Sequence, residues 1–334
     1  MIYNFLFYLF ISFITIMLVS KVSYKLNLVD EPNKRKIHLK PTAFTGGLAL
    51  SLLYIFSIFF FFVESHSLNL ILSIAFLIAL VGLIDDKLNL NVSSKLCLQI
   101  IPILFLILLE DLSLNHIGDY NFFKLELNSF SIPFTFLSIV FLINAANYFD
   151  GLDGTLSITT LSVFGILYFL IIDKDINLFI IIVMTPILVF LFFNFSIFKL
   201  PKMFLGDSGS LLIGFIISFT LIFIANEKLI HPILLAWSIS IFVYEFLSIN
   251  LIRLIKKKNI FKSGQDHLHH VLYHKTKSLF WVNFIISITN IIFFIIGYIS
   301  FIYINSLASL ALFIIFFKIF FSIRYGLLNK YSLI

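Results

Sequence analysis

Five polar stretches interrupt an otherwise apolar chain, and each combines residue types that handle phosphate or a divalent metal. Carboxylates suit Mg²⁺, which is usually bound by one or two carboxylates plus substrate phosphates. Lysine side chains and the free amides at helix starts bind phosphate oxygens. Together the stretches predict a phosphoryl-transfer site. They are DEPNKRKIHLKPTAFTGG (30–47), GLIDDKLNL (82–90), NAANYFDGLDGT (144–155), PKMFLGDSGSLLIG (201–214) and DHLHH (266–270).

The second stretch places Asp85 and Asp86 at the end of an apolar run, where an unpaired charge is costly. We interpret them as a metal-binding or general-base pair, the alternative being an ordinary acidic turn that ends a helix. Lys95, nine residues on, is predicted to bind a phosphate as a point charge.

The fourth stretch frames Asp207 with Gly206 and Gly209 just before a predicted helix. A helix start bordered by glycine offers backbone amides to an anion, and the carboxylate beside it suits Mg²⁺. The alternative is a simple helix cap, because Asp is common before a helix.

The third stretch carries Asn144, Asn147, Asp150 and Asp153 at spacings of three. On a helix end this spacing puts side chains on one face. A plain turn needs fewer polar residues, so the stretch is predicted to hold a ligand between two helices.

The fifth stretch has His267, His269 and His270 within four residues. Zinc is disfavoured because the chain has one cysteine, Cys97, and no HExxH pattern. Histidines after a run of lysines fit phosphate or nucleotide binding better, the alternative being a polar loop on a membrane surface.

Composition identifies the class of protein. Of 334 residues 60% are hydrophobic and 12% charged, and the mean hydropathy is +1.08. Soluble domains have about 25% charged residues. We predict an all-α polytopic membrane protein, a single transferase domain over residues 1–334, with Cys97 buried and too few cysteines for a disulfide. The net charge of +6 needs no nucleic acid to explain it.

Hydropathy predicts about eleven membrane spans. Lysine and arginine concentrate in one set of alternating loops, including Arg324 in the tail, and only Lys124, Lys174 and Lys228 lie in the other set. The positive-inside rule then puts the N-terminus outside, and the C-terminus and all five polar stretches on the cytoplasmic face. In the longest outer loop, the alternation in FKLEL predicts a small hairpin. The spans lie near 3–20, 47–63, 68–84, 95–112, 132–148, 155–172, 176–195, 209–225, 230–252, 279–304 and 307–323.

In this order and spacing, the five stretches resemble the polyprenyl-phosphate N-acetylhexosamine-1-phosphate transferases, bacterial members of glycosyltransferase family 4. The resemblance implies a bacterial inner-membrane enzyme that transfers a sugar-1-phosphate, most simply GlcNAc-1-phosphate, from a UDP-N-acetylhexosamine to undecaprenyl phosphate. UMP is released and a lipid-linked envelope glycan begins, for example lipopolysaccharide O-antigen. The cofactor implied is Mg²⁺, with Mn²⁺ as an alternative, and homodimer formation is left open.

The resemblance also implies roles for residues. Asp85 and Asp86 would be catalytic, Asp207 would bind the metal with Asn147 contributing, and the basic first loop would bind substrate. A covalent aspartyl intermediate stays open beside direct displacement. The implied substrate-binding residues are Lys40, Lys95, Asn144, Asn147, Asp150, Asp153, His267, His269 and His270.

Two positions depart from the family pattern. Glu245 stands where an Asp is common, and Gln265 replaces an Arg that often precedes the last motif. DHLHH favours the branch that uses simpler sugars over the phospho-MurNAc-pentapeptide transferases. Other classes of protein considered are an ion-coupled transporter, which needs charges near mid-membrane, an intramembrane aspartyl protease, which needs a second Asp within a span, and an inactive scaffold.

Overall fold

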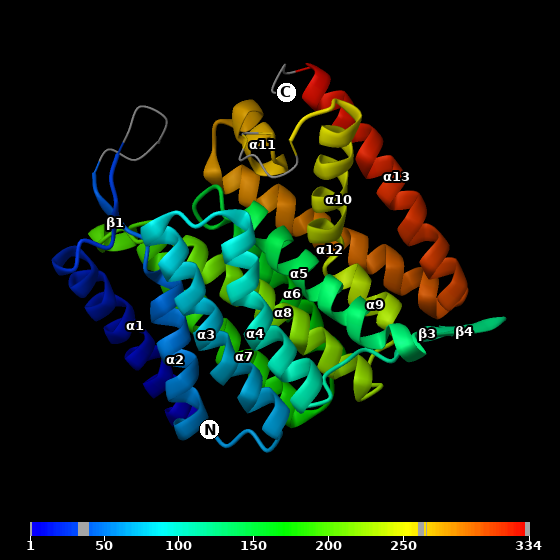
Figure 1. Cartoon of the computed structure of the whole chain (residues 1–334), viewed down its shortest axis with the longest axis horizontal. Helices are drawn as coiled ribbons and strands as arrows, with labels where there is room; N and C mark the ends of the chain where they lie inside the picture. Colours follow the sequence, from blue (N-terminus) through cyan, green and yellow to red (C-terminus); the bar gives the residue numbers. More distant parts are fainter. Residues whose placement is uncertain (1, 33–39, 260–263, 265, 331–334) are drawn as a thin grey trace. The chain divides into compact units, whose positions relative to one another are not determined.

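A computed structural model describes residues 2–32, 40–259, 264 and 266–330, and Figure 1 shows them as a mostly helical chain. The chain divides into two compact units. The first comprises Met1–Asp111 and Ile172–Thr220, and the second comprises Leu112–Ile171 and Leu221–Ile334.

The first unit is built from helices that pack around α2, which contacts α1, α3 and α7. Its short strands β1 and β2 pair antiparallel. The elements are α1 (Ile2–Lys25), β1 (Val29–Asp30), β2 (Thr42–Ala43), α2 (Gly46–Phe60), α3 (His66–Leu88), α4 (Val92–Leu109), α7 (Lys174–Asn194), η2 (Ile197–Lys199) and most of α8 (Gly206–Asn226).

The second unit packs around α12, which contacts α6, α9, α10, α11 and α13. Strands β3 and β4 form the predicted small hairpin, which is confirmed. The elements are β3 (His116–Tyr120), β4 (Phe123–Glu126), η1 (Asn128–Phe130), α5 (Ser131–Phe149), α6 (Thr155–Leu170), α9 (Pro232–Ser238), α10 (Ser240–Ile255), α11 (Leu268–Thr276), α12 (Leu279–Tyr303) and α13 (Ser306–Lys330).

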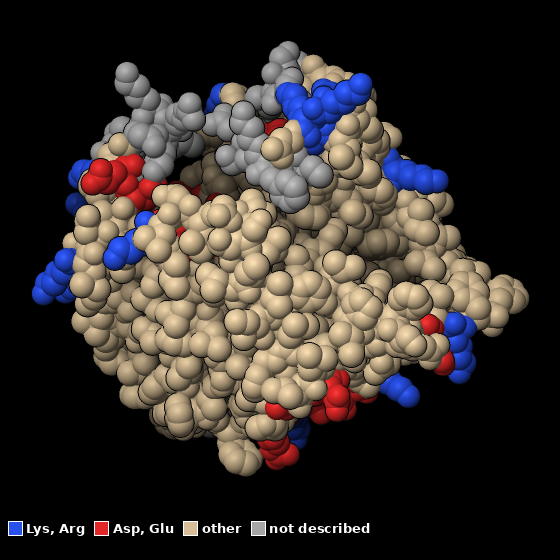
Figure 2. All heavy atoms as spheres, viewed as in Figure 1, with Lys and Arg blue, Asp and Glu red and all other residues tan. Residues whose placement is uncertain are grey.

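Helices long and apolar enough to cross a membrane dominate both units. Within the described residues there are eight of them, or nine if the bent pair α9–α10 is one span. Helices α2 and α6 are apolar but shorter, and they lie where two further spans were predicted. Each predicted span is therefore helical, while the count of eleven stays a prediction. Most of the surface visible in Figure 2 is uncharged, as a lipid-facing surface requires. Cys97, predicted buried, is exposed.

The predicted span 230–252 is not one straight helix, because it bends by 72° between α9 and α10. At the break Ile239 has φ −110° and ψ 16°. The amide of Asn290, on α12, replaces the lost helical hydrogen bonds: its Nδ2 donates to Ser238 O at 2.9 Å and its Oδ1 accepts from Ile241 N at 3.3 Å. A backbone break in an apolar setting needs such partners.

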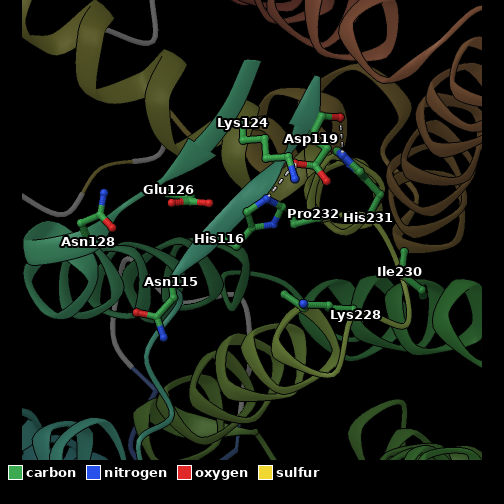
Figure 3. A pocket seen from close by; sticks show the side chains of 11 residues that line it. Asn115, His116, Asp119, Lys124, Glu126, Asn128, Lys228, Ile230, His231 and Pro232 are labelled. Atoms are coloured by element: carbon green, nitrogen blue, oxygen red, sulfur yellow. Dashed lines mark hydrogen bonds and ion pairs between the residues drawn. The ribbon is translucent and has the colours of Figure 1, made fainter. Parts of the chain in front are cut away.

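The hairpin and the segment before α9 line a pocket of about 670 Å³ in the second unit (Figure 3). Asp119, one of the lining residues, contacts two histidines: its carboxylate lies 3.1 Å from His116 Nε2, and its carbonyl lies 3.1 Å from His231 Nε2. His231 Nδ1 also accepts the amide of Ile233 and so caps α9. These histidines, which sequence analysis left without a catalytic role, have structural contacts here.

The packing of α12 on α9 gives a test of the fold. A Cβ at Gly297 would overlap the indole ring of Trp237, whereas a Cβ at Gly165, on α6, would meet no atom within 4 Å. We expect Gly297→Ala to lose about 1–3 kcal/mol through overpacking and Gly165→Ala to be neutral or stabilising. Thermal unfolding of both variants in detergent checks this. Equal melting temperatures would contradict the packing described.

Candidate active site

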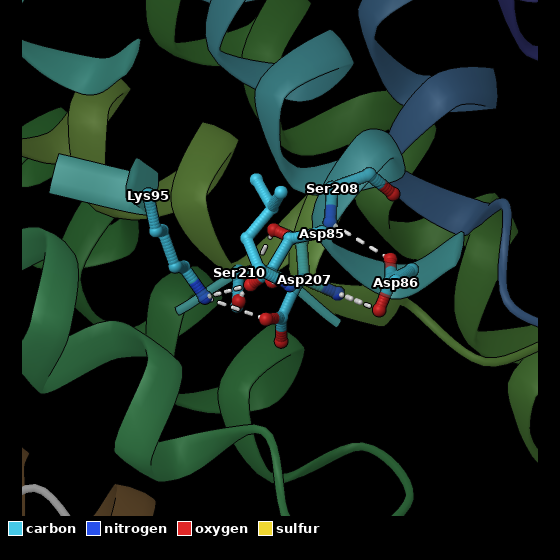
Figure 4. Close-up of polar contacts among 7 residues, drawn as sticks. Asp85, Asp86, Lys95, Asp207, Ser208 and Ser210 are labelled. Atoms are coloured by element: carbon cyan, nitrogen blue, oxygen red, sulfur yellow. Dashed lines mark hydrogen bonds and ion pairs between the residues drawn. The ribbon is translucent and has the colours of Figure 1, made fainter. Parts of the chain in front are cut away.

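Three carboxylates and one ammonium come together in the first unit (Figure 4). Asp85 and Asp86 lie in the last turn of α3, Lys95 in the first turn of α4, and Asp207 at the start of α8. Lys95 Nζ lies 2.6 Å from Asp85 Oδ2 and 2.5 Å from Asp207 Oδ2. Residues separated by more than a hundred positions therefore share one ion-pair cluster, as the phosphoryl-transfer prediction requires.

Asp86 has a different set of contacts from Asp85. Its Oδ1 accepts the amide of Asp207 at 3.0 Å, and its Oδ2 accepts the amide of Ser208 at 3.2 Å. A carboxylate at these positions caps the helix and interacts favourably with its dipole. Asp86 therefore holds the start of α8, and it fixes the position of Asp207.

Close backbone contact makes this arrangement possible. A Cβ at Gly82 would overlap the backbone of Ser208, so α3 approaches the start of α8 only because residue 82 has no side chain. Gly206 has φ +73°, and a Cβ there would meet Phe44 O and Asp86 Oδ2. The left-handed conformation and the contact both require glycine.

Short connections place the other members of the cluster. Asn89 ends α3 in the left-handed conformation, and Asp85 Oδ1 accepts the amide of Leu90 at 2.9 Å. Asn91 then caps α4 by accepting the amide of Ser94 at 2.8 Å. The tight turn between the two helices puts Lys95 beside Asp85.

The donor set of the cluster fits a hard divalent cation. Asp85 and Asp207 already direct one oxygen each at a single positive charge, that of Lys95, and carboxylate oxygens are what Mg²⁺ prefers. No group of three or more His, Cys, Asp or Glu side chains with ligand geometry occurs among the described residues. Mg²⁺ commonly takes few protein ligands and completes its shell with phosphate and water.

The second unit holds the rest of the predicted residues. Asn144 and Asn147 lie in α5, but this helix ends at Phe149, so Asp150 is its C-cap and Asp153 follows in a turn. The expected single helical face is therefore wrong. Gly154 has φ +79° and is the N-cap residue of α6, so a new helix begins a few residues after α5 ends.

An asparagine that sequence analysis missed holds this turn. Asn283, on α12, donates its Nδ2 to Asp153 O at 2.9 Å and accepts Thr155 Oγ1 at 2.8 Å. Asn144 Nδ2 donates to Val140 O at 2.7 Å. An isolated Asn inside an apolar helix was the available signal for Asn283.

The three histidines lie against the end of α5. His267 is the N-cap residue of α11, and its ring centroid is 4.6 Å from that of Tyr148. His269 is 1% exposed, and a Cβ at Gly151 would overlap its ring. His270 packs against His269 with 4.2 Å between ring centroids and an angle of 53° between the rings. The structure therefore brings DHLHH and NAANYFDGLDGT together within the second unit.

Burial keeps these imidazoles neutral near pH 7. It lowers the pKa of His267 to about 4 and the pKa of His269 well below its usual value, and it also lowers the pKa of His270. His267 Nδ1 and His269 Nε2 are buried without a hydrogen-bond partner. Buried polar atoms are normally paired, so these two nitrogens have unused hydrogen-bonding capacity.

The remaining predicted residues divide as follows. Lys40 is exposed in the bend before β2, and its carbonyl accepts Thr42 Oγ1 at 3.0 Å. Glu245, noted as a departure from the family pattern, forms a buried ion pair with Arg324, which sequence analysis had assigned only to membrane orientation. Arg35, Lys36, His38 and Gln265 lie outside the described residues.

Comparison with known proteins shows what the chain is similar to. Residues 68–225 match the family described as glycosyl transferase family 4. They contain three of the five polar stretches, 82–90, 144–155 and 201–214. The undecaprenyl-phosphate alpha-N-acetylglucosaminyl 1-phosphate transferase of Salmonella typhi is 28% identical over 269 residues, 78% of this chain and 72% of the relative.

Two further relatives extend the similarity. The enzyme of the same name from Yersinia pestis is 27% identical over 275 residues, 80% of this chain and 75% of its own. The probable undecaprenyl-phosphate N-acetylglucosaminyl 1-phosphate transferase of Bacillus subtilis (strain 168) is 28% identical over 306 residues, 84% of this chain and 83% of its own. Residues 68–225, which hold the cluster of Asp85, Lys95 and Asp207, therefore match glycosyl transferase family 4, and most of the chain is similar to these transferases.

Proposed function

We propose that this protein transfers N-acetylglucosamine-1-phosphate, or a closely related N-acetylhexosamine-1-phosphate, from a UDP-sugar to undecaprenyl phosphate. UMP is the second product, and a lipid-linked sugar that starts an envelope glycan is the first. The reaction takes place at the cytoplasmic face of the bacterial inner membrane. The names of the relatives support this substrate class.

The observation that carries the proposal is the sharing of Lys95 between Asp85 and Asp207. In an apolar chain, such a cluster offers both a cation for phosphate oxygens and carboxylates for a divalent metal. An inactive scaffold has no need of it. A transporter needs such groups along a path through the membrane.

In the proposed reaction, an oxygen of the lipid phosphate attacks the phosphorus that carries the sugar. The bond between that phosphorus and the bridging oxygen breaks, and UMP leaves with the electron pair. The acceptor is largely ionised near pH 7, because the second pKa of a phosphate monoester is about 6. Little base catalysis is needed, so positioning and charge neutralisation supply most of the rate.

The residues of the first unit have separate roles in this reaction. Lys95 neutralises phosphate charge, and Asp85 orients both Lys95 and the acceptor. Asp207 would hold Mg²⁺, which would supply positive charge to stabilise the diphosphate of the donor and the leaving UMP. Asp86 acts through α8 by fixing Asp207. Direct displacement needs no covalent aspartyl intermediate.

The residues of the second unit bind the donor. The unpaired nitrogens of His267 and His269 contact its diphosphate or sugar, and Asn144, Asp150 and Asp153 contact the nucleotide. A metal contact from Asn147, a phosphate contact from Lys40 and a homodimer stay predictions.

The first experiment monitors UMP release by purified protein in detergent with undecaprenyl phosphate and a panel of UDP-sugars. We expect release to require both the lipid and Mg²⁺ and to be fastest with UDP-N-acetylglucosamine. Chelation should abolish it, and Mg²⁺ or Mn²⁺ should restore it. If folded protein that binds the lipid releases no UMP with any donor, the proposed function is wrong.

A second experiment tests the ammonium of the cluster. Lys95→Met should lower kcat about 10²- to 10³-fold, the usual cost of losing one preorganised electrostatic contact. Lys87→Met is the matched control, because Lys87 lies in the last turn of α3, before the same turn between helices, but is exposed. Its rate should be unchanged. If Lys95→Met keeps the same kcat as Lys87→Met and the wild type, Lys95 has no role in transfer.

A further inference from the structure

The last transmembrane helix carries an arginine in an apolar interior. Arg324, on α13, is 1% exposed, and it lies well outside the family-matched residues 68–225. Figure 1 shows that the end of α13 lies beside α10 and α11, which both contact it. An arginine is rarely buried without a carboxylate partner, so its contacts identify what it does.

Arg324 forms a two-point ion pair with Glu245 of α10. Its Nε donates to Glu245 Oε2 at 2.7 Å, and its Nη2 donates to Oε1 at 2.9 Å. Both side chains have further bonds to the polar segment that contains the histidines. Nη2 also donates to Asp266 O at 2.7 Å, and Glu245 Oε1 also accepts the amide of Leu268 at 2.8 Å.

These two backbone contacts flank His267 on either side. The pair therefore fixes the residue before His267 and the residue after it, and it defines where α11 begins. A planar guanidinium suits this task better than an ammonium, because its donors have a rigid fork geometry.

A second ion pair supports the same segment. Arg253 Nε donates to Asp266 Oδ2 at 2.8 Å, and Arg253 Nη2 donates to Oδ1 at 2.6 Å. Burial alone would raise the pKa of Asp266, but the guanidinium overcomes it and lowers the pKa below the usual value. Asp266 is therefore held ionised by its side chain and clamped at its carbonyl.

The segment fixed in this way presents unpaired polar atoms. His267 Nδ1, His269 Nε2 and Arg324 Nη1 are all buried with no hydrogen-bond partner. Leaving such groups unpaired costs free energy, and a bound anion would remove that cost. The ring of His267 lies against Tyr148 at the end of α5, and the ring of His269 lies against Gly151. Both of these neighbours belong to the predicted nucleotide-binding stretch.

We infer that Arg324 and Glu245 are positioning residues for the UDP-sugar: their ion pair clamps Asp266 and Leu268 so that His267 and His269 stand ready for the diphosphate of the donor. This inference rests on the proposed function. It also explains Glu245 as the carboxylate that bonds to both the last helix and the amide of Leu268, rather than as a loss of the usual Asp.

A single substitution does not separate positioning from stability, because Arg324→Met leaves the Glu245 carboxylate buried without its cationic partner. The double variant Arg324→Met/Glu245→Met removes both charges, and replacing a buried ion pair by apolar residues often preserves stability. Arg324→Lys keeps the charge but loses the fork. Lys318→Met, an exposed lysine on the same helix, is the matched control.

The experiment measures kcat and KM for UDP-N-acetylglucosamine and for undecaprenyl phosphate, with thermal unfolding in detergent. We expect the double variant to keep its folding transition and to lose on the order of 100-fold in kcat/KM for the UDP-sugar, with KM for the lipid unchanged. Arg324→Lys should show the same change to a smaller extent, and Lys318→Met should show none.

The outcomes separate the two proposals. If the wild-type protein transfers no sugar-phosphate, the proposed function fails. Suppose that the wild type transfers the sugar-phosphate. Positioning is then excluded if the double variant and Arg324→Lys keep the wild-type KM for the donor, or if their kcat/KM falls equally for the donor and the lipid. If the double variant does not fold, Arg324→Lys decides by the same criterion.

Discussion

The cost of placing a charge in an apolar interior governs this structure. A buried charge is tolerated when it has a partner of opposite sign. The chain meets this condition in each unit. The partly buried Lys95 bridges Asp85 and Asp207 in the first unit, and in the second the fully buried Glu245 binds Arg324. Each partnership joins separate helices, so the same contacts that permit the charges also position them.

The backbone obeys the same requirement. Where helices break or begin within apolar surroundings, side chains from other elements satisfy the exposed groups. Asn290 serves the break between α9 and α10, Asn283 serves the turn after α5, and Asp86 serves the start of α8. The turn after α5 and the start of α8 belong to the predicted site segments, whereas the break between α9 and α10 does not. Polar residues in the spans are therefore as much structural as chemical.

Hydropathy predicted each helical span, because burial in lipid requires long apolar helices with all backbone groups paired. The alternation of apolar and charged residues in FKLEL predicted the hairpin. The motifs predicted that Asp85, Lys95 and Asp207 meet. Sequence did not predict the break at Ile239, since the break is held by Asn290 on α12, which accepts the amide of Ile241 from 49 residues further along the chain. Nor did it predict the burial of Arg324, because a basic residue near the C-terminus also fits the positive-inside rule.

In the proposed reaction, the two units supply different kinds of polar group. In the first, opposite charges already satisfy each other, so a phosphate can enter by exchanging partners with Lys95 while carboxylates are released to a metal. In the second, His267 and His269 are fixed but have buried nitrogens without partners. Side chains that can exchange one ionic partner for another suit the reacting phosphates, whose charge changes during transfer. Rigid, unpaired and neutral donors suit the part of a substrate that is only held, because a preorganised site loses little entropy on binding.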